Sequence, residues 1–340
     1  MDSGQKKEDR RDTGNSSPLK RRVIDPADFD TVAVVMGGAS AEREISLLSG
    51  RAVLAALKRK GVDAVGIDVD DRPLPALQAC RFDRVFNIVH GRGGEDGVLQ
   101  GVLEALGVPY TGSRVLGSAL SMDKLRTKMC WKSVGIPTPP WRLLRSDEDV
   151  PPCAEALGFP VIVKPALEGS SIGISKANDV AELKAARRDA ARYRCDVFAE
   201  SWVRGEEYTV AILDDAALPI IRLETPNVFY DYDAKYCADT TRYHCPCGLS
   251  EETEEQLQEL ALNAYRALDA SGWGRVDLFL DAGQQPWLIE ANTVPGMTDH
   301  SLVPMAAKAA GIDFDELVWR ILETSFGIRN QETGNREQNR

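Results

Sequence analysis

Histidine is scarce in this chain, and long apolar runs are absent. The 340 residues include only three histidines, at positions 90, 244 and 300. A bound metal is therefore expected to take oxygen ligands, which favours a hard ion such as Mg²⁺. No uncharged apolar run approaches the length that crosses a bilayer, and the N-terminus lacks the apolar segment of a signal peptide. We therefore expect a cytoplasmic protein that does not bind a membrane.

Positive charge is also in deficit. Lys and Arg number 41 against 52 Asp and Glu, and the resulting net charge of −11 argues against nucleic acid as a partner. The seven cysteines are an odd number scattered along the chain, so we expect reduced thiols rather than a disulfide framework. The short run 244–247 (His-Cys-Pro-Cys) lacks the second ligand pair of a zinc site, and zinc is therefore disfavoured.

The order of apolar segments predicts an α/β protein with polar ends. Residues 1–28 and 327–340 have the composition of disordered tails, which leaves a folded part of about 29–326. In the first third, predicted strands alternate with helical patterns, and this favours a parallel sheet covered by helices. One helix is predicted over 122–134. Segment 225–248 has neither a helical nor a strand period, and so long an irregular stretch is typical of a lid or binding loop.

Residues 275–292 have the pattern of a β-hairpin. If Gly283 and Gln284 form a two-residue turn, Asp277 lies opposite Glu290. Because side chains alternate along a strand, both carboxylates then lie on one face of the ribbon. The other face is expected to be apolar core, formed by Val276, Leu278, Leu280, Trp287, Ile289 and Ala291.

Two carboxylates that face each other repel unless a cation lies between them. At ~5 Å and an effective dielectric constant near 20, the repulsion is roughly 3 kcal/mol. The same register places Arg275 opposite Asn292, whose amide oxygen adds a neutral ligand. Asp277, Glu290 and Asn292 therefore form an oxygen-only set that suits Mg²⁺ together with water and phosphate. A solvated acidic rim, or an ion pair with Arg275 alone, is the alternative interpretation.

Three glycine-rich segments follow predicted strands. Lys164 ends an apolar strand before 168–173, and this pattern indicates either phosphate-binding donors or a flexible exposed loop. Gly37 and Gly38 follow the first strand, but GxGxxG is not met, which disfavours a nicotinamide-dependent oxidoreductase. Segment 90–97 follows the third strand, where ligands bind in open α/β sheets, although a surface turn explains it equally well. A non-catalytic nucleotide-binding module is a further alternative.

Six ordered stretches together carry a family resemblance. They are VAVVMGGASAEREISLLSG, VFNIVHGRGGEDGVLQGVLEALGVPYTGS, MDKLRTK, VIVKPALEGSSIGISK, VFYDYDAKY, and GRVDLF followed by LIEANTVPGMTDHSLVP. They resemble the motifs of D-alanine–D-alanine ligases, a branch of the ATP-grasp family, and cover essentially all of 29–326. The resemblance implies a three-domain α/β ATP-grasp fold. Its parts would be an N-terminal Rossmann-like (pre-ATP-grasp) domain at 29–112, a central α+β domain at 113–202, and a C-terminal α+β domain at 203–326 with a lid at 225–248.

The resemblance also implies a reaction. ATP would be held between the central and C-terminal domains with two Mg²⁺ or Mn²⁺ ions, and one D-alanine carboxylate would attack the γ-phosphate to give D-alanyl phosphate. The amine of a second D-alanine would then displace phosphate and form the dipeptide used for peptidoglycan. A homodimer is implied as well. D-alanyl-D-lactate and D-alanyl-D-serine ligases are near alternatives, and the pattern YDYDAKY around Tyr236 favours an amine nucleophile.

Site residues are implied position by position where the motifs match. The ATP-binding positions would be Lys124, Lys164, Glu168, Ser170, Ser171, Glu200, Trp202, Val203 and Glu207. The metal ligands would be Asp277, Glu290 and Asn292. Glu42 and His90 would bind the first D-alanine, and Ser301 and Leu302 the second. The catalytic positions would be Glu42, Ser170, Tyr236, Arg275 and Gly296. Among these, Arg275 and the Gly296 N–H would stabilise the oxyanion of the tetrahedral intermediate. Ser170 and Tyr236 would hydrogen-bond with Glu42 and pin the lid.

Overall fold

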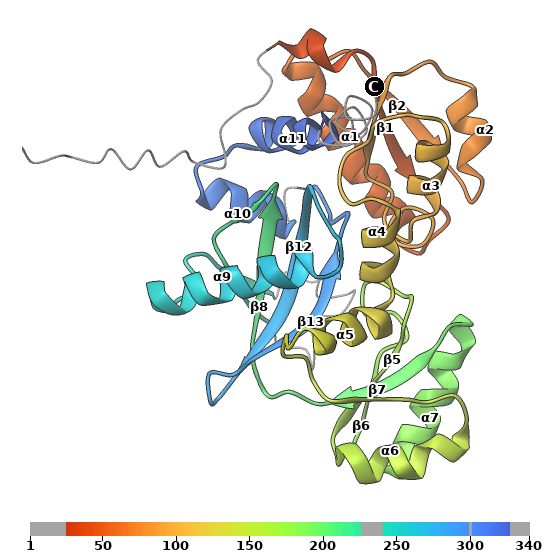
Figure 1. Ribbon diagram of the computed structural model, residues 1–340, viewed down its shortest axis with the longest axis vertical. Helices are drawn as coiled ribbons and strands as arrows, with labels where there is room; N and C mark the ends of the chain where they lie inside the picture. The colour runs from red at the N-terminus through yellow and green to blue at the C-terminus, as the bar shows by residue number, and fades with distance from the viewer. Residues whose placement is uncertain (1–24, 226–240, 299–300, 327–340) are drawn as a thin grey trace, which may run out of the picture.

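Three sheets follow one another along the long axis of the molecule (Figure 1). The computed structural model describes residues 25–225, 241–298 and 301–326. A parallel sheet lies towards one end, a four-stranded antiparallel sheet lies at the other, and a larger antiparallel sheet lies between them. The predicted α/β class is confirmed. No helix in these ranges is both long enough and apolar enough to span a bilayer.

The N-terminal sheet is parallel, as predicted, with the strand order β2-β1-β3. Its elements are β1 (Val32–Gly37), α1 (Arg43–Arg59), β2 (Ala64–Val69), α2 (Pro73–Gln78), β3 (Arg84–Asn87) and α3 (Val98–Ala105). Every residue of β1 is buried, because helices cover both faces of the sheet. Tyr110 pairs with Val85 through an isolated parallel bridge at the edge of this sheet.

The second sheet is antiparallel and has the strand order β4-β7-β5-β6. Its elements are β4 (Trp141–Leu143), α6 (Val150–Leu157), β5 (Val161–Pro165), β6 (Ser175–Ala177), α7 (Val180–Ala190) and β7 (Val197–Ser201). Val161 and Val163 pack with α6 and α7 on one face. Ile162 and Lys164 alternate with them and therefore lie on the other face, which lines a cleft.

The largest sheet has six strands along the path β11-β10-β8-β12-β13, with β9 paired to β8. Its elements are β8 (Gly205–Leu213), β9 (Ala216–Ala217), β10 (Ile221–Glu224), β11 (Arg242–His244), α9 (Glu251–Arg266), β12 (Trp273–Asp281) and β13 (Pro286–Asn292). Leu257 and Tyr265 of α9 pack against Val276 and Leu278 of β12. This packing covers one face of the sheet and leaves the other for the cleft.

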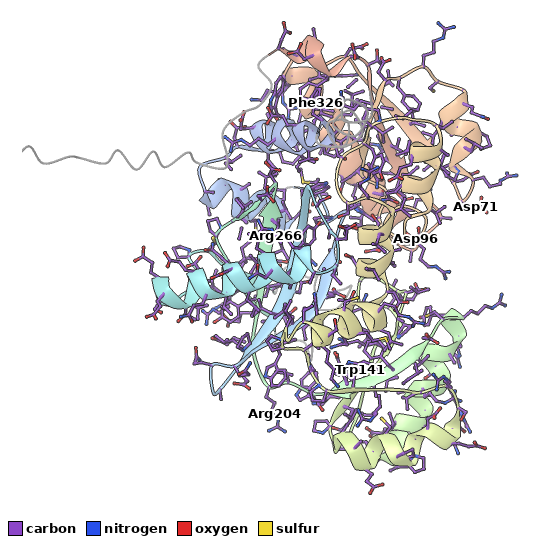
Figure 2. All side chains as sticks on the ribbon, viewed as in Figure 1. Asp71, Asp96, Trp141, Arg204, Arg266 and Phe326 are labelled. Atoms are coloured by element: carbon purple, nitrogen blue, oxygen red, sulfur yellow. The ribbon has the colours of Figure 1, made fainter. Side chains whose placement is uncertain are left out.

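Two short helices connect the first sheet to the others. They are α4 (Val115–Met122) and α5 (Lys124–Ser133), and Asp123 divides the helix predicted over 122–134 by capping α5. Trp131 is fully buried and donates a hydrogen bond of 2.8 Å to the Ala264 carbonyl of α9. Trp141, labelled in Figure 2, packs near Leu125 of α5. Helix α5 therefore contacts elements of both antiparallel sheet regions.

The last helices return to the N-terminal sheet. They are α10 (Leu302–Ala309) and α11 (Phe314–Glu323), and α11 lies beside α1 (Figure 1). Trp319 meets the ring of Phe29 edge-on, with 4.9 Å between ring centroids. Phe326, labelled in Figure 2, lies 5.3 Å from the same ring and 4.0 Å from the guanidinium of Arg84. Four 3₁₀ turns complete the described elements: Pro26–Phe29, Asp147–Asp149, Ala191–Tyr193 and Thr324–Phe326.

The β12–β13 hairpin has the predicted register at the acidic end but a different turn. The predicted pairs are present, Asp277 with Glu290 and Arg275 with Asn292. The predicted two-residue turn is wrong, because the Asp281 N–H bonds the Gln285 carbonyl and three residues lie between them. Gln284 takes a left-handed φ of 61°, which is typical of a three-residue hairpin loop. A register shift between Asp277 and Leu278 then restores the predicted pairing.

This shift changes which side chains form the core. Leu288 pairs with Leu278 and is fully buried, whereas the sequence predicts Trp287 and Ile289 on the core face. Both of these residues are only partly buried. Trp287 donates a hydrogen bond to Asp281 at 2.9 Å, and Ile289 lines the cleft. The prediction for Trp287 and Ile289 is therefore wrong, because one extra residue in β13 turns the strand over.

Candidate active site

A cavity of about 570 Å³ lies where the N-terminal sheet, the α4–α5 junction and the hairpin meet. It brings together predicted positions that are far apart in the sequence. They are Glu42, His90, Lys124, Ser170, Arg275, Glu290, Asn292, Gly296, Ser301 and Leu302. This cavity, which we call the reaction cavity, therefore gathers most of the predicted catalytic and substrate-binding residues.

A narrower cleft of about 80 Å³ lies between the two antiparallel sheets. The predicted ATP and metal positions that line it are Lys164, Ser171, Glu200, Trp202, Val203, Glu207, Asp277 and Glu290. Ile162, Phe279 and Ile289 add apolar surface. Glu290 lines both spaces, so the cleft and the reaction cavity adjoin. The cleft combines flat apolar walls with charged ends, as a site for a nucleotide requires.

Among the predicted residues that the structure describes, Glu168 is not found at these sites. Glu168 lines neither space: its carboxylate faces a separate cavity and lies 4.0 Å from Arg92. Only its backbone carbonyl approaches the site, where it accepts a hydrogen bond of 2.8 Å from Lys124. Tyr236 lies outside the described residues, as does most of the predicted lid.

Glu42 and Ser170 meet at the rim of the reaction cavity. Glu42 stands at the N-cap position of α1, and the Ser170 hydroxyl donates a short hydrogen bond to its carboxylate. Glycine at 169 permits this approach, because a Cβ there would lie 2.5 Å from the Glu42 Oε2. Ser170 and Ser171 both have positive φ values, 48° and 60°, and such backbone strain concentrates at functional sites.

The interior of the reaction cavity holds two buried titratable groups. Burial lowers the pKa of His90, whose ring nitrogens lie 2.8 Å from the Val294 carbonyl and 3.3 Å from the Ser49 hydroxyl. Burial, with help from Glu42, raises the pKa of Glu95 to about 8. Both groups are therefore mainly uncharged near neutral pH. Glu95 is a site residue that the sequence reasoning missed, although it belongs to the glycine-rich segment after the third strand.

Lys124 links the start of α5 to the hairpin. Its ammonium lies 3.1 Å from the Glu290 Oε2. Burial alone would lower the pKa of Lys124, but the carboxylates of Glu290, Glu42 and Glu95 outweigh burial and raise it. Lys124 therefore keeps a positive charge at the junction of the cavity and the cleft.

Arg275 binds the other hairpin carboxylate. Its guanidinium makes two hydrogen bonds of 2.8 Å to Asp277, which also accepts one of 2.6 Å from Thr209. The ion pair considered from the sequence as an alternative is thus present. With Lys124 on Glu290, both facing carboxylates are neutralised by side chains of the protein.

The same hairpin face suits a hard metal ion in its donor chemistry. Asp277, Glu290 and Asn292 supply carboxylate and amide oxygens from one side of the ribbon. In the described ranges, no three His, Cys, Asp or Glu side chains gather in a way that could hold a metal. A metal at the hairpin would therefore depend on the Asn292 amide as its third protein ligand.

A second buried charge cluster lies behind the cleft. Glu200 forms ion pairs with Lys164 and with Lys128, the latter at 2.6 Å. Lys128 is 0% exposed, and burial lowers its pKa to about 8. Burial would raise the pKa of Glu200, but the two lysines outweigh it and hold the pKa below its ordinary value. Lys128 was also missed, although it lies one helical turn after Lys124 in the quoted stretch MDKLRTK.

The two antiparallel sheets, the charged cleft between them and the parallel sheet beside them define an ATP-grasp enzyme. Comparison with known proteins gives the particular family. The family model described as "D-ala D-ala ligase C-terminus" matches residues 130–323, and "D-ala D-ala ligase N-terminus" matches residues 73–113. The chain belongs to the D-alanine–D-alanine ligase family.

Full-length relatives agree with this assignment. The chain is 64% identical over 308 residues to the D-alanine–D-alanine ligase of Methylococcus capsulatus, which covers 91% of this chain and 100% of that protein. It is 58% identical over 311 residues to the D-alanine–D-alanine ligase of Nitrosococcus oceani, with 92% and 98% covered.

Solved structures show the same fold. The D-alanine–D-alanine ligase from Bacillus anthracis is 36% identical and superposes with a TM-score of 0.78, covering 89% of this chain and 99% of that chain. The structure of that ligase complexed with ATP superposes with a TM-score of 0.77 at 35% identity, with 89% and 98% covered. The VanG D-Ala:D-Ser ligase from Enterococcus faecalis superposes with a TM-score of 0.77 at 29% identity, with 87% and 99% covered. The predicted ATP-grasp fold is confirmed.

Proposed function

We propose that this chain joins two D-alanine molecules, at the expense of ATP, to give the peptidoglycan precursor D-alanyl-D-alanine through a D-alanyl phosphate. The observation that carries the proposal is the reaction cavity. It places an acid for an ammonium group (Glu42), a cation for a developing oxyanion (Arg275) and a helix N-terminus for a carboxylate (Ser301) beside a charged nucleotide cleft. These are the groups that two amino acids and an acyl phosphate require.

The nucleotide would occupy the cleft between the antiparallel sheets. The apolar walls at Ile162, Phe279 and Ile289 suit the base, while Lys164 and Lys124 offer ammonium groups to the phosphates. Asp277, Glu290 and Asn292 would hold Mg²⁺ or Mn²⁺. A divalent ion there supplies neutralisation of the phosphate charge during transfer.

The first D-alanine would place its ammonium group on Glu42. The hydrogen bond from Ser170 orients this carboxylate, and the buried His90 and Glu95 add little charge near neutral pH. Glu42 is thus the anionic group at that end of the reaction cavity. The carboxylate of the same substrate then points towards the cleft, where phosphoryl transfer takes place.

The second D-alanine would place its carboxylate at the start of α10. Ser301 precedes this helix, and the Leu302 N–H is one of the helix donors without an intrahelical partner. The Ser301 hydroxyl is held 2.9 Å from the Thr298 N–H and hydroxyl, which fixes its position. Arg275, oriented by its two hydrogen bonds to Asp277, and the Gly296 N–H would stabilise the tetrahedral oxyanion.

An acyl phosphate hydrolyses when water reaches it, so the reaction cavity must close before transfer. Thr241 and Tyr243, at the end of the proposed lid 225–248, line the cavity. We assign Tyr236 of this segment to closure through a hydrogen bond to Glu42. The chain would act in the cytoplasm, where ATP is available, and as a homodimer.

The test measures ADP release and product mass with D-alanine, using L-alanine as the control. D-alanine plus D-serine and D-alanine plus D-lactate are run in parallel. We expect ADP release with D-alanine alone and a product of the D-alanyl-D-alanine mass, and we expect neither with L-alanine. A preference for D-serine or D-lactate at neutral pH would contradict the proposal. A Glu42→Gln variant should lose turnover while it retains ATP binding.

A further inference from the structure

Three charged side chains form a continuous row of buried ion pairs beside the nucleotide cleft. Lys128 reaches Glu200 at 2.6 Å, and the other carboxylate oxygen of Glu200 pairs with Lys164. Lys128 also donates a hydrogen bond of 2.6 Å to the Thr138 hydroxyl, which in turn donates to the Leu288 carbonyl at 2.9 Å. Lys164 and Glu200 line the cleft, whereas Lys128 does not.

Lys128 cannot touch a ligand in the cleft. It is fully buried, does not line the cleft, and is separated from it by Glu200. Taking an ammonium group out of water costs several kcal/mol, and its low pKa reflects that cost. An apolar side chain of the same length would avoid the cost, so the position of the charge calls for a physical reason.

Positive charge is scarce among the residues that line the cleft itself. Among the described residues that line it, Lys164 is the only lysine or arginine, while the acidic residues are Glu200, Glu207, Asp277 and Glu290. If Glu200 were paired with Lys164 alone, the two charges would cancel. Lys128 supplies a second positive charge to Glu200. The group of three side chains, Lys128, Glu200 and Lys164, therefore has a net charge of +1. Lys164 is the positively charged member that lines the cleft.

We propose that Lys128 is a positioning residue for nucleotide binding: by neutralising Glu200 from behind, it leaves the charge of Lys164 available to the phosphates of the ligand. This inference rests on the proposed function, because it takes a nucleoside polyphosphate as the ligand of the cleft. It assigns to Lys128 an electrostatic role that requires a charge and not merely a side chain that fills space.

The test measures dissociation constants by calorimetry at fixed Mg²⁺ concentration and ionic strength, without D-alanine. The probes are ATP and inorganic triphosphate, since triphosphate carries the phosphates without the base. Lys128→Met removes the charge and keeps the length. We expect it to weaken triphosphate binding about tenfold, because it removes one positive charge near the phosphates. Lys128→Gln, which keeps a hydrogen-bond donor for Thr138, should weaken binding to a similar degree.

Variants of Glu200 separate an electrostatic role from a structural one. The double variant Lys128→Met/Glu200→Gln restores the net charge of +1 at these three positions. Its triphosphate affinity should return to within about threefold of the wild type. Glu200→Gln alone raises this net charge to +2 and should bind triphosphate more tightly than the wild type. If Lys128 only supported the fold, the double variant would bind as weakly as Lys128→Met, and this result would overturn the proposal.

Each variant is checked for folding by circular dichroism and by its thermal midpoint. If Lys128→Met does not fold, Lys128→Gln and Glu200→Gln still decide the question. Unchanged triphosphate affinity in Lys128→Gln, or no gain in Glu200→Gln, counts against the proposal. Binding is measured without D-alanine, so the two proposals can fail separately. A protein that did not join D-alanine would refute the proposed function, but its triphosphate affinities would still test the role of Lys128.

Discussion

Glu95→Gln tests the electrostatics of the reaction cavity through the pH dependence of stability. The Glu95 carboxyl is buried, and its Oε1 accepts a hydrogen bond of 2.7 Å from the Gly91 N–H. Burial first, and the nearby Glu42 second, raise its pKa from an ordinary 4.5 to about 8. Glutamine has nearly the same shape and can still accept the Gly91 hydrogen bond, but it cannot ionise. The substitution therefore removes the titration and keeps the contact.

The direction of the pH dependence of stability follows from whether the folded or the unfolded state binds the Glu95 proton more tightly. The folded protein keeps the Glu95 proton up to about pH 8, whereas the unfolded chain releases it near pH 4.5. The contribution of Glu95 to stability is complete below pH 4.5 and is lost as the pH rises towards about 8. Between pH 5.5 and pH 8.5 the loss amounts to about 3 kcal/mol for a single independent group. Glu95→Gln should not show this loss.

Urea unfolding at pH 5.5, 7.0 and 8.5 measures the effect. The free energies of unfolding of the wild type and Glu95→Gln should differ least at pH 5.5 and should diverge as the pH rises, with the variant more stable at pH 8.5. Glu255→Gln, on the exposed side of α9, controls for the loss of one carboxylate from the protein. Parallel pH profiles for the wild type and Glu95→Gln would refute the reasoning.

Three further predictions concern the reaction cavity, the hairpin and the core. Ser170→Ala removes the hydrogen bond to Glu42 and should lower kcat/KM for D-alanine by ~10-fold or more in an ADP-release assay; an unchanged value would exclude an orienting role for Ser170. Glu290→Gln should lower Mg²⁺-dependent turnover by ~100-fold or more while the circular dichroism spectrum stays native, and wild-type activity would contradict the metal assignment. Trp131→Ala should destabilise the protein by about 3–5 kcal/mol in urea unfolding, because it empties a fully buried site and leaves the Ala264 carbonyl unpaired; a loss below about 1 kcal/mol would contradict the packing.

The hairpin shows both the reach and the limit of sequence reasoning. The facing of Asp277 and Glu290 was predicted correctly from an incorrect turn. Two irregularities offset each other in the register of β12 and β13. The loop is one residue longer than expected, and β13 carries one extra residue at Ile289. Neither is visible in the alternation of apolar residues, because a left-handed glutamine and a local register shift depend on contacts with neighbouring strands.

The site residues divide in the same way. Most residues that the motifs single out line the two spaces, because each motif lies near the end of a strand or the start of a helix that the fold brings to one place. Glu95 and Lys128 were missed because their importance comes from burial and from partners distant in sequence, such as Glu200. The Glu168 side chain lies towards Arg92 and its backbone carbonyl accepts a hydrogen bond from Lys124, an arrangement that the motif alone does not indicate.

The packing of α11 on α1 has a consequence for folding while the protein is being made on the ribosome. Residues from the two ends of the chain form a single hydrophobic core, in which Phe29 contacts Trp319 and Phe326. A ribosome that makes the chain from its N-terminus therefore produces α1 and Phe29 long before α11, the helix that packs against them. Until α11 emerges, the apolar surface that Trp319 covers at Phe29 stays open to solvent and to other chains, so we expect a product truncated before Phe314 to expose that surface.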